Sequence, residues 1–209
     1  MKLIDRMFAQ FACPSGRLGR LAGTMMARGN ADVNAWAVDL LAVQPGDRVI
    51  DVGCGPGLAV EAAAAKATSG LVVGVDHSDV MIEQATRRNQ AGIRAGCVEL
   101  RQATAQALGY PDGQFTKACA VNNAMMWPSP PDGMRELRRV LVPRGRLVVI
   151  LRERVEDAGR FDRARFAGVP GERIAEVEAA IGAGGFQDLV TRRRTIGKER
   201  FVAFIAHRP

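Results

Sequence analysis

The chain has 209 residues, of which 47% are hydrophobic and 24% charged, and its net charge is +7. This length and composition predict one soluble globular domain spanning residues 1–209. No apolar run approaches the roughly 20 residues that a membrane-spanning helix needs. Asp5 and Arg6 stand where a signal peptide would have its apolar core. We therefore expect a cytoplasmic protein without stable membrane insertion.

The cysteines and the positive charge suggest neither a metal site nor a nucleic-acid site. The four cysteines lie far apart and include no C-x-x-C pair, which is typical of reduced thiols and gives no zinc site. The basic residues are scattered, with local groups at 138–139 and 192–194, and no aromatic residues are interleaved with them. This pattern is typical of a solvated surface, so nucleic acid is not the expected partner.

In chain order, predicted helices and strands alternate. Apolar residues at helical spacing predict a helix over 31–42 within an N-terminal helical cap segment, residues 1–42. Ser78 and Asp79 predict the start of a helix over about 80–91, and Asp132 is expected to cap a later helix that buries Leu141. The further expected elements are strands at 48–52, 71–75, 98–102, 117–121 and 146–151, a helix at 58–67, and a turn at 143–145.

The last quarter of the chain breaks this alternation. A helix is expected near 171–181, followed by two strands, FQDLVTRR and RFVAFIAH. Only a short turn around Gly197 and Lys198 separates these strands, and so short a link forces an antiparallel pair. The sequence therefore predicts an α/β fold with a parallel sheet that ends in an antiparallel hairpin, with helices on both faces.

The stretch VIDVGCGPGL, residues 49–58, brings a predicted strand into three glycines and then into a helix. Glycines lack the Cβ atoms that would hold a ligand away from the backbone. A dinucleotide fingerprint would place its third glycine at position 58, where this chain has Leu58. Asp76 closes the next strand, where a carboxylate can accept both hydroxyls of a ribose. A nucleoside-containing ligand other than a dinucleotide is favoured, and the alternative for Asp76 is a helix cap.

These features and three further stretches resemble the class I S-adenosylmethionine-dependent methyltransferases, especially the group around the ubiquinone and menaquinone biosynthesis enzymes. The further stretches are VVGVDHSDVMIEQA, LGYPDGQF and MRELRRVLVPRGRLVVI. Together the matching stretches cover residues 46–151, about half of the chain. The resemblance implies a Rossmann-like seven-stranded sheet, with five parallel strands and a C-terminal antiparallel hairpin, and S-adenosylmethionine as cofactor.

The resemblance also implies the site residues. The glycines would admit the methionine portion and the ribose, Asp76 would hold the ribose hydroxyls, and His77 and Met81 would lie beside the adenine. The residues expected to contact the cofactor are Gly53, Cys54, Gly55, Gly57, Asp76, His77, Met81, Thr104, Ala105 and Asn122. At position 104 relatives often carry an acid, and Thr104 is a weaker acceptor for the adenine amino group.

The acceptor is expected to be a small, partly apolar molecule, methylated by in-line displacement mainly through positioning. Its pocket would be built by residues 1–35, 122–131 and 152–170, with Asn123, Met125, Met126 and Trp127 lining it and Met25 and Met26 nearby. The motif commits His77 to the cofactor, and His207 ends the last predicted strand, so no general base is identified.

Several alternatives remain open: an RNA methyltransferase, a phospholipid methyltransferase, and a cofactor-binding protein without catalysis. The segment NNAMMW lacks the carboxylates of a metal-dependent site and the Pro-Pro-aromatic turn of base-methylating enzymes. We expect no metal, a small-molecule substrate as partner, and a monomer or homodimer.

Overall fold

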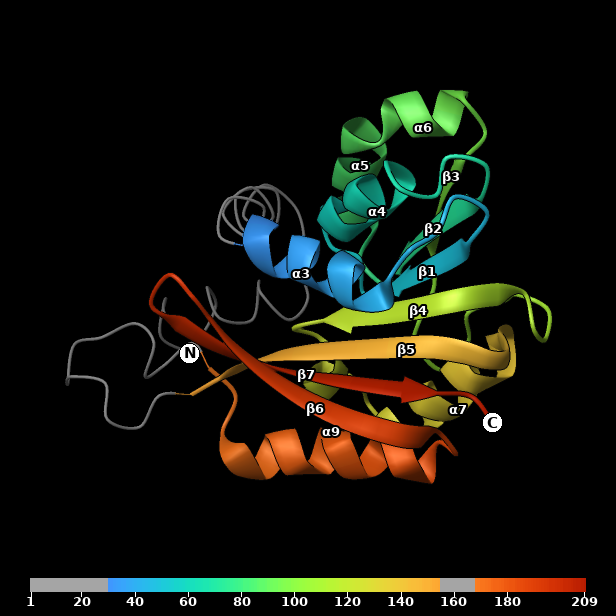
Figure 1. Cartoon of the computed structure of the whole chain (residues 1–209). Coiled ribbons are helices and arrows are strands. Elements are labelled where there is room, and N and C mark those ends of the chain that lie inside the picture. Colours follow the sequence, from blue (N-terminus) through green and yellow to red (C-terminus); the bar gives the residue numbers. More distant parts are fainter. Residues whose placement is uncertain (1–29, 155–167) are drawn as a thin grey trace. The chain divides into compact units, whose positions relative to one another are not determined.

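The computed structural model describes residues 30–154 and 168–209 (Figure 1). Expectations about residues 1–29, including Met25 and Met26, and about residues 155–167 lie outside the described residues. The chain divides into two compact units, the first ending at Thr104 and the second beginning at Ala105.

The first unit alternates helices with three parallel strands. Strand β2 pairs in parallel with β1 on one side and with β3 on the other. The helices α4 and α5 pack against these strands, and α3 packs on α4. The elements are α3 (Ala31–Leu41), β1 (Arg48–Val52), α4 (Leu58–Ala64), β2 (Leu71–Asp76), α5 (Asp79–Arg88), α6 (Gln90–Arg94) and β3 (Val98–Gln102).

Strands β1 and β2 form the centre of this unit, because nine of their eleven residues are buried. Ile50 and Val73 are fully buried, and the two strands are in register at Ile50 and Val73. Such continuous apolar runs are what strands covered on both faces require. The expected inner face of α3 is confirmed: Val33, Trp36, Ala37, Leu40 and Leu41 are all buried.

The second unit contains the remaining strands. Strand β5 pairs in parallel with β4 and antiparallel with β7, and β7 pairs antiparallel with β6. Helices α7 and α9 pack on each other and on β5. The elements are β4 (Phe115–Val121), the short 3-10 helix η1 (Ala124–Met126), α7 (Pro130–Val140), β5 (Leu141–Glu153), α9 (Gly171–Ala183), β6 (Gln187–Ile196) and β7 (Glu199–His207).

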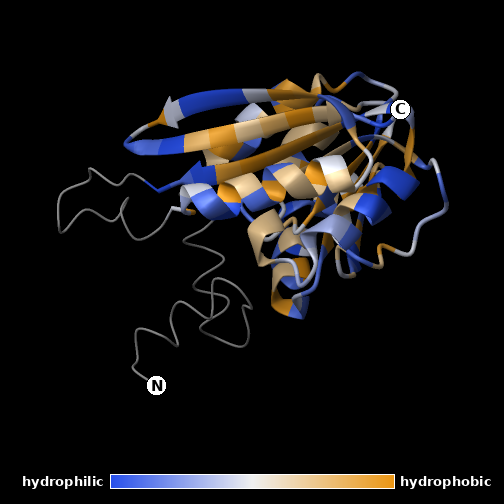
Figure 2. Ribbon diagram, turned by 90° about the horizontal axis from the view of Figure 1, so that it is seen from below, coloured by the Kyte–Doolittle hydropathy of each residue, from blue (hydrophilic) through white to orange (hydrophobic). Residues whose placement is uncertain are grey.

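The strand order is β3-β2-β1-β4-β5-β7-β6 in one seven-stranded sheet, and only the pairs of the final hairpin are antiparallel. This order confirms the expected Rossmann-like fold. The hydropathy changes sharply at the hairpin: β7 is mostly hydrophobic and β6 mostly hydrophilic (Figure 2). Within residues 30–154 and 168–209, no helix has both the length and the apolar character needed to cross a membrane.

Several expected boundaries are wrong, each for a local reason. Asp132 does not cap α7: the N-cap is Ser129, and Pro130 begins the helix, a position that tolerates proline because its N–H would lack a helical partner. Asp132 lies in the first turn, where a hydrogen bond with Ser129 lowers its pKa. The turn expected at 143–145 lies inside the longer strand β5, and Arg144 there takes a φ of 63°.

Three helices also differ from expectation. The helix expected over 58–67 ends at Ala64, and the one expected over 80–91 is divided into α5 and α6 at Asn89. Leu141 was expected inside a helix; it follows α7 and begins β5, although it is fully buried as expected.

Candidate functional site

The glycine loop between β1 and α4 has a left-handed backbone at each of its glycines. The φ values are 72° at Gly53, 51° at Gly55 and 79° at Gly57. Residues with a Cβ avoid this region of backbone space, so three of the five loop positions favour glycine for conformational reasons alone. The loop thus brings bare backbone to the carboxyl end of β1.

The loop amides are bound within the protein. The N–H groups of Gly53 and Cys54 donate to the Val75 carbonyl over 2.7 and 2.9 Å, and that of Gly57 donates to the Cys54 carbonyl over 3.0 Å. The Gly55 N–H donates to Oδ2 of Asp76 over 2.9 Å. A pyrophosphate site of the dinucleotide type needs free amide donors in such a loop. This arrangement therefore fits a ligand that brings donors of its own.

Asp76 offers such a ligand an acceptor. It is only 6% exposed. Its Oδ1 accepts the Ser78 N–H over 2.9 Å, while Oδ2 accepts the Gly55 N–H. One N–H on each oxygen fixes the carboxylate, and an ionised carboxylate has about four acceptor positions, so two hydroxyls of a ribose can still be accepted. A Cβ added to Gly55 would meet nothing within 4 Å, so the loop is open on that side.

Two residues at the end of α5, Arg88 and Asn89, bind the backbone of the glycine loop. Local sequence patterns did not identify either residue. Asn89 is buried and donates through Nδ2 to the Gly57 carbonyl over 3.1 Å. Arg88 donates through Nε to the Pro56 carbonyl over 3.0 Å. A Cβ on Gly57 would come within 2.5 Å of Asn89 Nδ2 and 3.1 Å of the Ala85 Cα. Close packing against α5 is therefore a second reason for glycine at position 57.

Cys54 and Met81 lie inside the first unit. Met81 is 1% exposed, and Cys54 is 7% exposed. Burial, together with the negative charges of Asp51 and Asp76, raises the pKa of the Cys54 thiol well above its usual value. The thiol of this loop residue is therefore harder to ionise than an exposed thiol, and the cofactor contacts of Cys54 and Met81 remain predictions.

His77 and Thr104 lie beside Asp76 because β3 is tied to β2 at that point. The Ala103 N–H donates to the Asp76 carbonyl over 3.0 Å, and Gln102 Nε2 donates to the His77 carbonyl over 2.9 Å. His77 Nδ1 lies 3.5 Å from Asp76 Oδ1, and the His77 side chain is 48% exposed. Thr104 is exposed directly after Ala103. Both side chains are exposed near the carboxyl end of β2, and their roles remain predictions.

In the second unit, Asn122 joins the carboxyl ends of β4 and β5. Its φ is 58°, a left-handed value that asparagine tolerates better than most residues. Its N–H donates to the Ile150 carbonyl over 2.7 Å, and its Oδ1 accepts the Arg152 N–H over 2.8 Å. Asn122 is therefore a structural link at this edge, whatever ligand contact it also makes. Asn123 is buried and donates through Nδ2 to the Val121 carbonyl.

The expected acceptor residues follow directly in η1 and beyond. Met126 is 45% exposed, whereas Met125 and Trp127 are half-buried. The Met125 carbonyl accepts Arg173 of α9 over 3.1 Å. The Trp127 ring occupies the space that a Cβ on Gly133 of α7 would need. The segment 122–127 is thus held by α7, α9 and β5.

The structure brings the expected residues together in two groups. Gly53 to Gly57, Asp76, His77, Met81 and Thr104 belong to the first unit, and Ala105, which is buried, Asn122, Asn123 and the residues 125–127 belong to the second. Among the described residues, no three His, Cys, Asp or Glu side chains gather in a way that could hold a metal ion.

Comparison with known proteins gives a consistent result. Residues 50–149 match the family model described as a methyltransferase domain. The chain is 28% identical over 189 residues to the uncharacterized methyltransferase YdaC of Bacillus subtilis, which covers 90% of this chain and 98% of that protein. It is 36% identical over 127 residues to the demethylmenaquinone methyltransferase of Symbiobacterium thermophilum, covering 59% of this chain and 49% of that protein.

A solved structure supports the fold. The SAM dependent methyltransferase from Aquifex aeolicus superposes with a TM-score of 0.69 at 19% identity, over 84% of this chain and 89% of that one. Contacts of the glycine loop and of Asp76 with S-adenosylmethionine remain predictions. Residues 50–149 therefore form a methyltransferase domain, and the chain is similar to a methyltransferase over 90% of its length.

Proposed function

We propose that this methyltransferase acts on a small, partly apolar acceptor, with an aromatic hydroxylated ring as the preferred class. One observation carries the proposal. The segment after β4 presents Met126, 45% exposed, next to the half-buried Trp127. An exposed methionine beside an indole ring makes an adaptable apolar surface. The name of the Symbiobacterium relative, a demethylmenaquinone methyltransferase, supports the same class of acceptor.

The protein's contribution would be mainly positioning. Bound S-adenosylmethionine supplies a methyl group that is already activated on a sulfonium, so holding the acceptor in line accounts for most of the required rate. In the first unit, the Gly55 N–H and the Ser78 N–H keep the Asp76 carboxylate fixed. In the second, α7 and α9 hold the segment 122–127. These contacts hold both groups in place within their own units.

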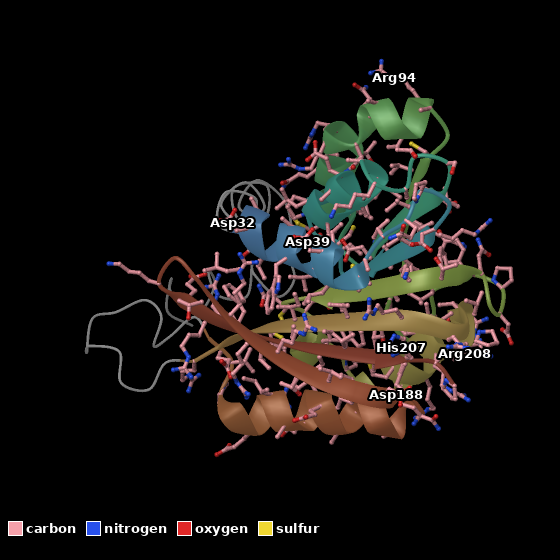
Figure 3. The ribbon with its side chains drawn as sticks, viewed as in Figure 1. Asp32, Asp39, Arg94, Asp188, His207 and Arg208 are labelled. Atoms are coloured by element: carbon pink, nitrogen blue, oxygen red, sulfur yellow. The ribbon has the colours of Figure 1, made fainter. Side chains whose placement is uncertain are left out.

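The histidines support a mechanism without a histidine base. The chain has only two of them. His207 pairs in register with Arg146, in the amino-terminal half of β5, while Asn122 bonds to Ile150 and Arg152 near its carboxyl end. Figure 3 shows His207 near Arg208 and Asp188 at that distant end of the hairpin. His77 adjoins Asp76, on the side of the proposed cofactor site. Acceptors that are already acidic, such as phenols or enols, suit such a site.

The test is methyl transfer from labelled S-adenosylmethionine to a panel of hydroxylated naphthoquinols, simple alcohols and total RNA. We expect labelling of the aromatic compounds, and a loss of at least tenfold in kcat/KM for Trp127→Ala. Phe115→Leu, which changes a buried core ring away from this segment, serves as a control for general destabilisation. If alcohols were methylated as fast as phenols, the proposal of positioning without a base would be wrong.

Salt dependence separates a small acceptor from RNA. RNA binding through five phosphate contacts would weaken by more than tenfold for a fourfold rise in salt, at a log–log slope of about −0.7 per contact. A neutral aromatic acceptor should bind almost equally at both salt concentrations. Labelling of RNA alone, with strong salt sensitivity, would replace the proposed acceptor by nucleic acid.

A further inference from the structure

The tip of the β6–β7 hairpin carries an unusual concentration of positive charge. We define the hairpin end as residues 152–154 of the β5 terminus together with residues 192–200. The register places Glu153 opposite Arg200, so these segments lie side by side. The hairpin end contains seven cations and two anions, 7 − 2 = +5, in a chain of net charge +7. The cations are Arg152, Arg154, Arg192, Arg193, Arg194, Lys198 and Arg200, and the anions are Glu153 and Glu199.

Both acids are already engaged by arginines of the same set. Glu153 is buried and lies 3.0 Å from Arg193 Nε and 3.8 Å from Arg200 Nε. Glu199 lies 3.0 Å from Arg152, whose guanidinium also stands over the Phe201 ring at 5.8 Å. The net charge of +5 already includes these two acids, so it describes the hairpin end as a whole.

The excess cations point in different directions. All residues of β6 except Ile196 are exposed, and successive side chains of a strand point to opposite faces. Arg193 shares a face with Glu153, whereas Arg192 and Arg194 lie on the other face of the hairpin. Lys198 is exposed in the turn. Cations spread around a tip cannot converge on one small anion, but they can all approach an extended anionic surface.

We propose that the hairpin end docks on the headgroups of an anionic lipid bilayer. Clusters of four or more basic residues are attracted to such a surface. Polynucleotides are the other extended polyanions, and single strands are commonly held by exposed aromatic rings on which bases stack. Strand β6 has no aromatic residue, and the phenylalanines of β7, Phe201 and Phe204, are each 1% exposed. The lipid surface is therefore the better match.

Docking would have a consequence for catalysis, and that consequence rests on the proposed function. The Arg152 N–H donates to Asn122 Oδ1, so the hairpin end adjoins the segment 122–127 within the same unit. A bilayer held at this edge would present apolar molecules dissolved in it to Met126 and Trp127. The docking surface would thus supply an apolar acceptor from the membrane rather than from water.

The experiment is sedimentation of the full chain with vesicles. Wild type should bind vesicles of 70% phosphatidylcholine and 30% phosphatidylglycerol, and binding should fall steeply with salt, while pure phosphatidylcholine vesicles should bind little. The double variant Arg192→Gln/Lys198→Gln should bind about 25-fold more weakly, at roughly fivefold for each basic residue. The control Arg94→Gln/Arg144→Gln removes the same charge from two other exposed sites and should stay within about twofold.

The outcomes separate the possibilities. Equal binding of wild type and the double variant, or equal binding to both vesicle types, would overturn the proposal. Tight binding of labelled RNA that the double variant loses, without vesicle binding, would assign the hairpin end to nucleic acid. The salt titration of wild type tests the proposal without any substitution. Methyl transfer to a water-soluble phenol, measured without vesicles, tests the proposed function separately, so one can fail while the other stands.

Discussion

Replacing Asp76 by alanine should weaken cofactor binding and destabilise the first unit at the same time. The carboxylate accepts two internal N–H groups, those of Gly55 and Ser78, each over 2.9 Å. Because Asp76 is 6% exposed, water replaces it poorly as an acceptor for these donors. The glycine loop would therefore lose its side-chain link to β2 at Gly55 as well as its ribose acceptor, while the bonds of Gly53 and Cys54 to the Val75 carbonyl remain.

The magnitudes follow from the kind of bond that is lost. Hydrogen bonds to charged groups contribute about 1.5–3 kcal/mol each. Since the Gly55 N–H is only partly buried, we expect a loss of about 2–4 kcal/mol in the free energy of unfolding, below the full sum of two such bonds. Loss of the ribose bonds should weaken S-adenosylmethionine binding by about 1.5–3 kcal/mol, roughly 10- to 150-fold. Asp76→Asn keeps one acceptor oxygen and should fall between wild type and alanine in both measurements.

Urea unfolding and isothermal calorimetry measure the two effects separately. Asp79→Ala is a matched control, because Asp79 is an exposed acid three positions away whose Oδ1 accepts the N–H of the neighbouring Val80. The control should cost less than about 1 kcal/mol in stability, as expected for an exposed residue in the first turn of a helix. An Asp76→Ala protein with wild-type stability and wild-type affinity would refute the role given to this carboxylate.

Three further results are expected. Iodoacetamide at pH 8 should alkylate the half-buried Cys97 before Cys54, because burial and nearby acids raise the Cys54 pKa; equal rates by mass spectrometry would contradict this. Burial, and then Arg146, hold the His207 pKa below its usual 6.5, so stability is lost as the pH falls below about 6.5; in urea, His207→Gln should lose less between pH 7.5 and pH 5, and parallel losses would contradict it. Thr104→Asp should retain or modestly tighten cofactor binding in calorimetry, since a carboxylate is the stronger acceptor; a folded variant that no longer binds would show that Thr104 does not face the adenine.

Three of the strands, β1, β2 and β3, were predictable from local sequence, although the run at 98–102 was the weaker signal. Arg48–Val52 and Val98–Gln102 have the expected bounds, and the apolar run at 71–75 extends by one residue to Asp76. Each run is short and bounded by turn residues, which leaves little room for a competing helix. The antiparallel hairpin was equally clear, because two residues between strands permit no crossover connection.

The features that the sequence did not predict, a residue's role and a strand's bounds, depend on tertiary contacts. Asn89 was not expected to matter, yet its side chain binds the Gly57 carbonyl across 32 positions of sequence. No local sequence pattern indicates that an asparagine at the end of a helix will form a hydrogen bond with a distant loop. Position 144 was predicted to lie in a turn. It lies inside the strand Leu141–Glu153, but the pairing with β4 skips residues 142–145 at a register shift, and the pairing with β7 begins at Arg146.

The arginine run of β6 has a second consequence, for solubility. As the last strand in the sheet order, β6 offers its backbone to any other strand that can pair with it. Native sheets protect such an edge with charged side chains and with bulges. Arg192, Arg193 and Arg194 provide the charges, and the register shift between Gln187 and Val190 provides the irregularity. Neutralising these arginines should therefore favour edge-to-edge self-association, and light scattering of such variants should rise with protein concentration while that of wild type stays flat.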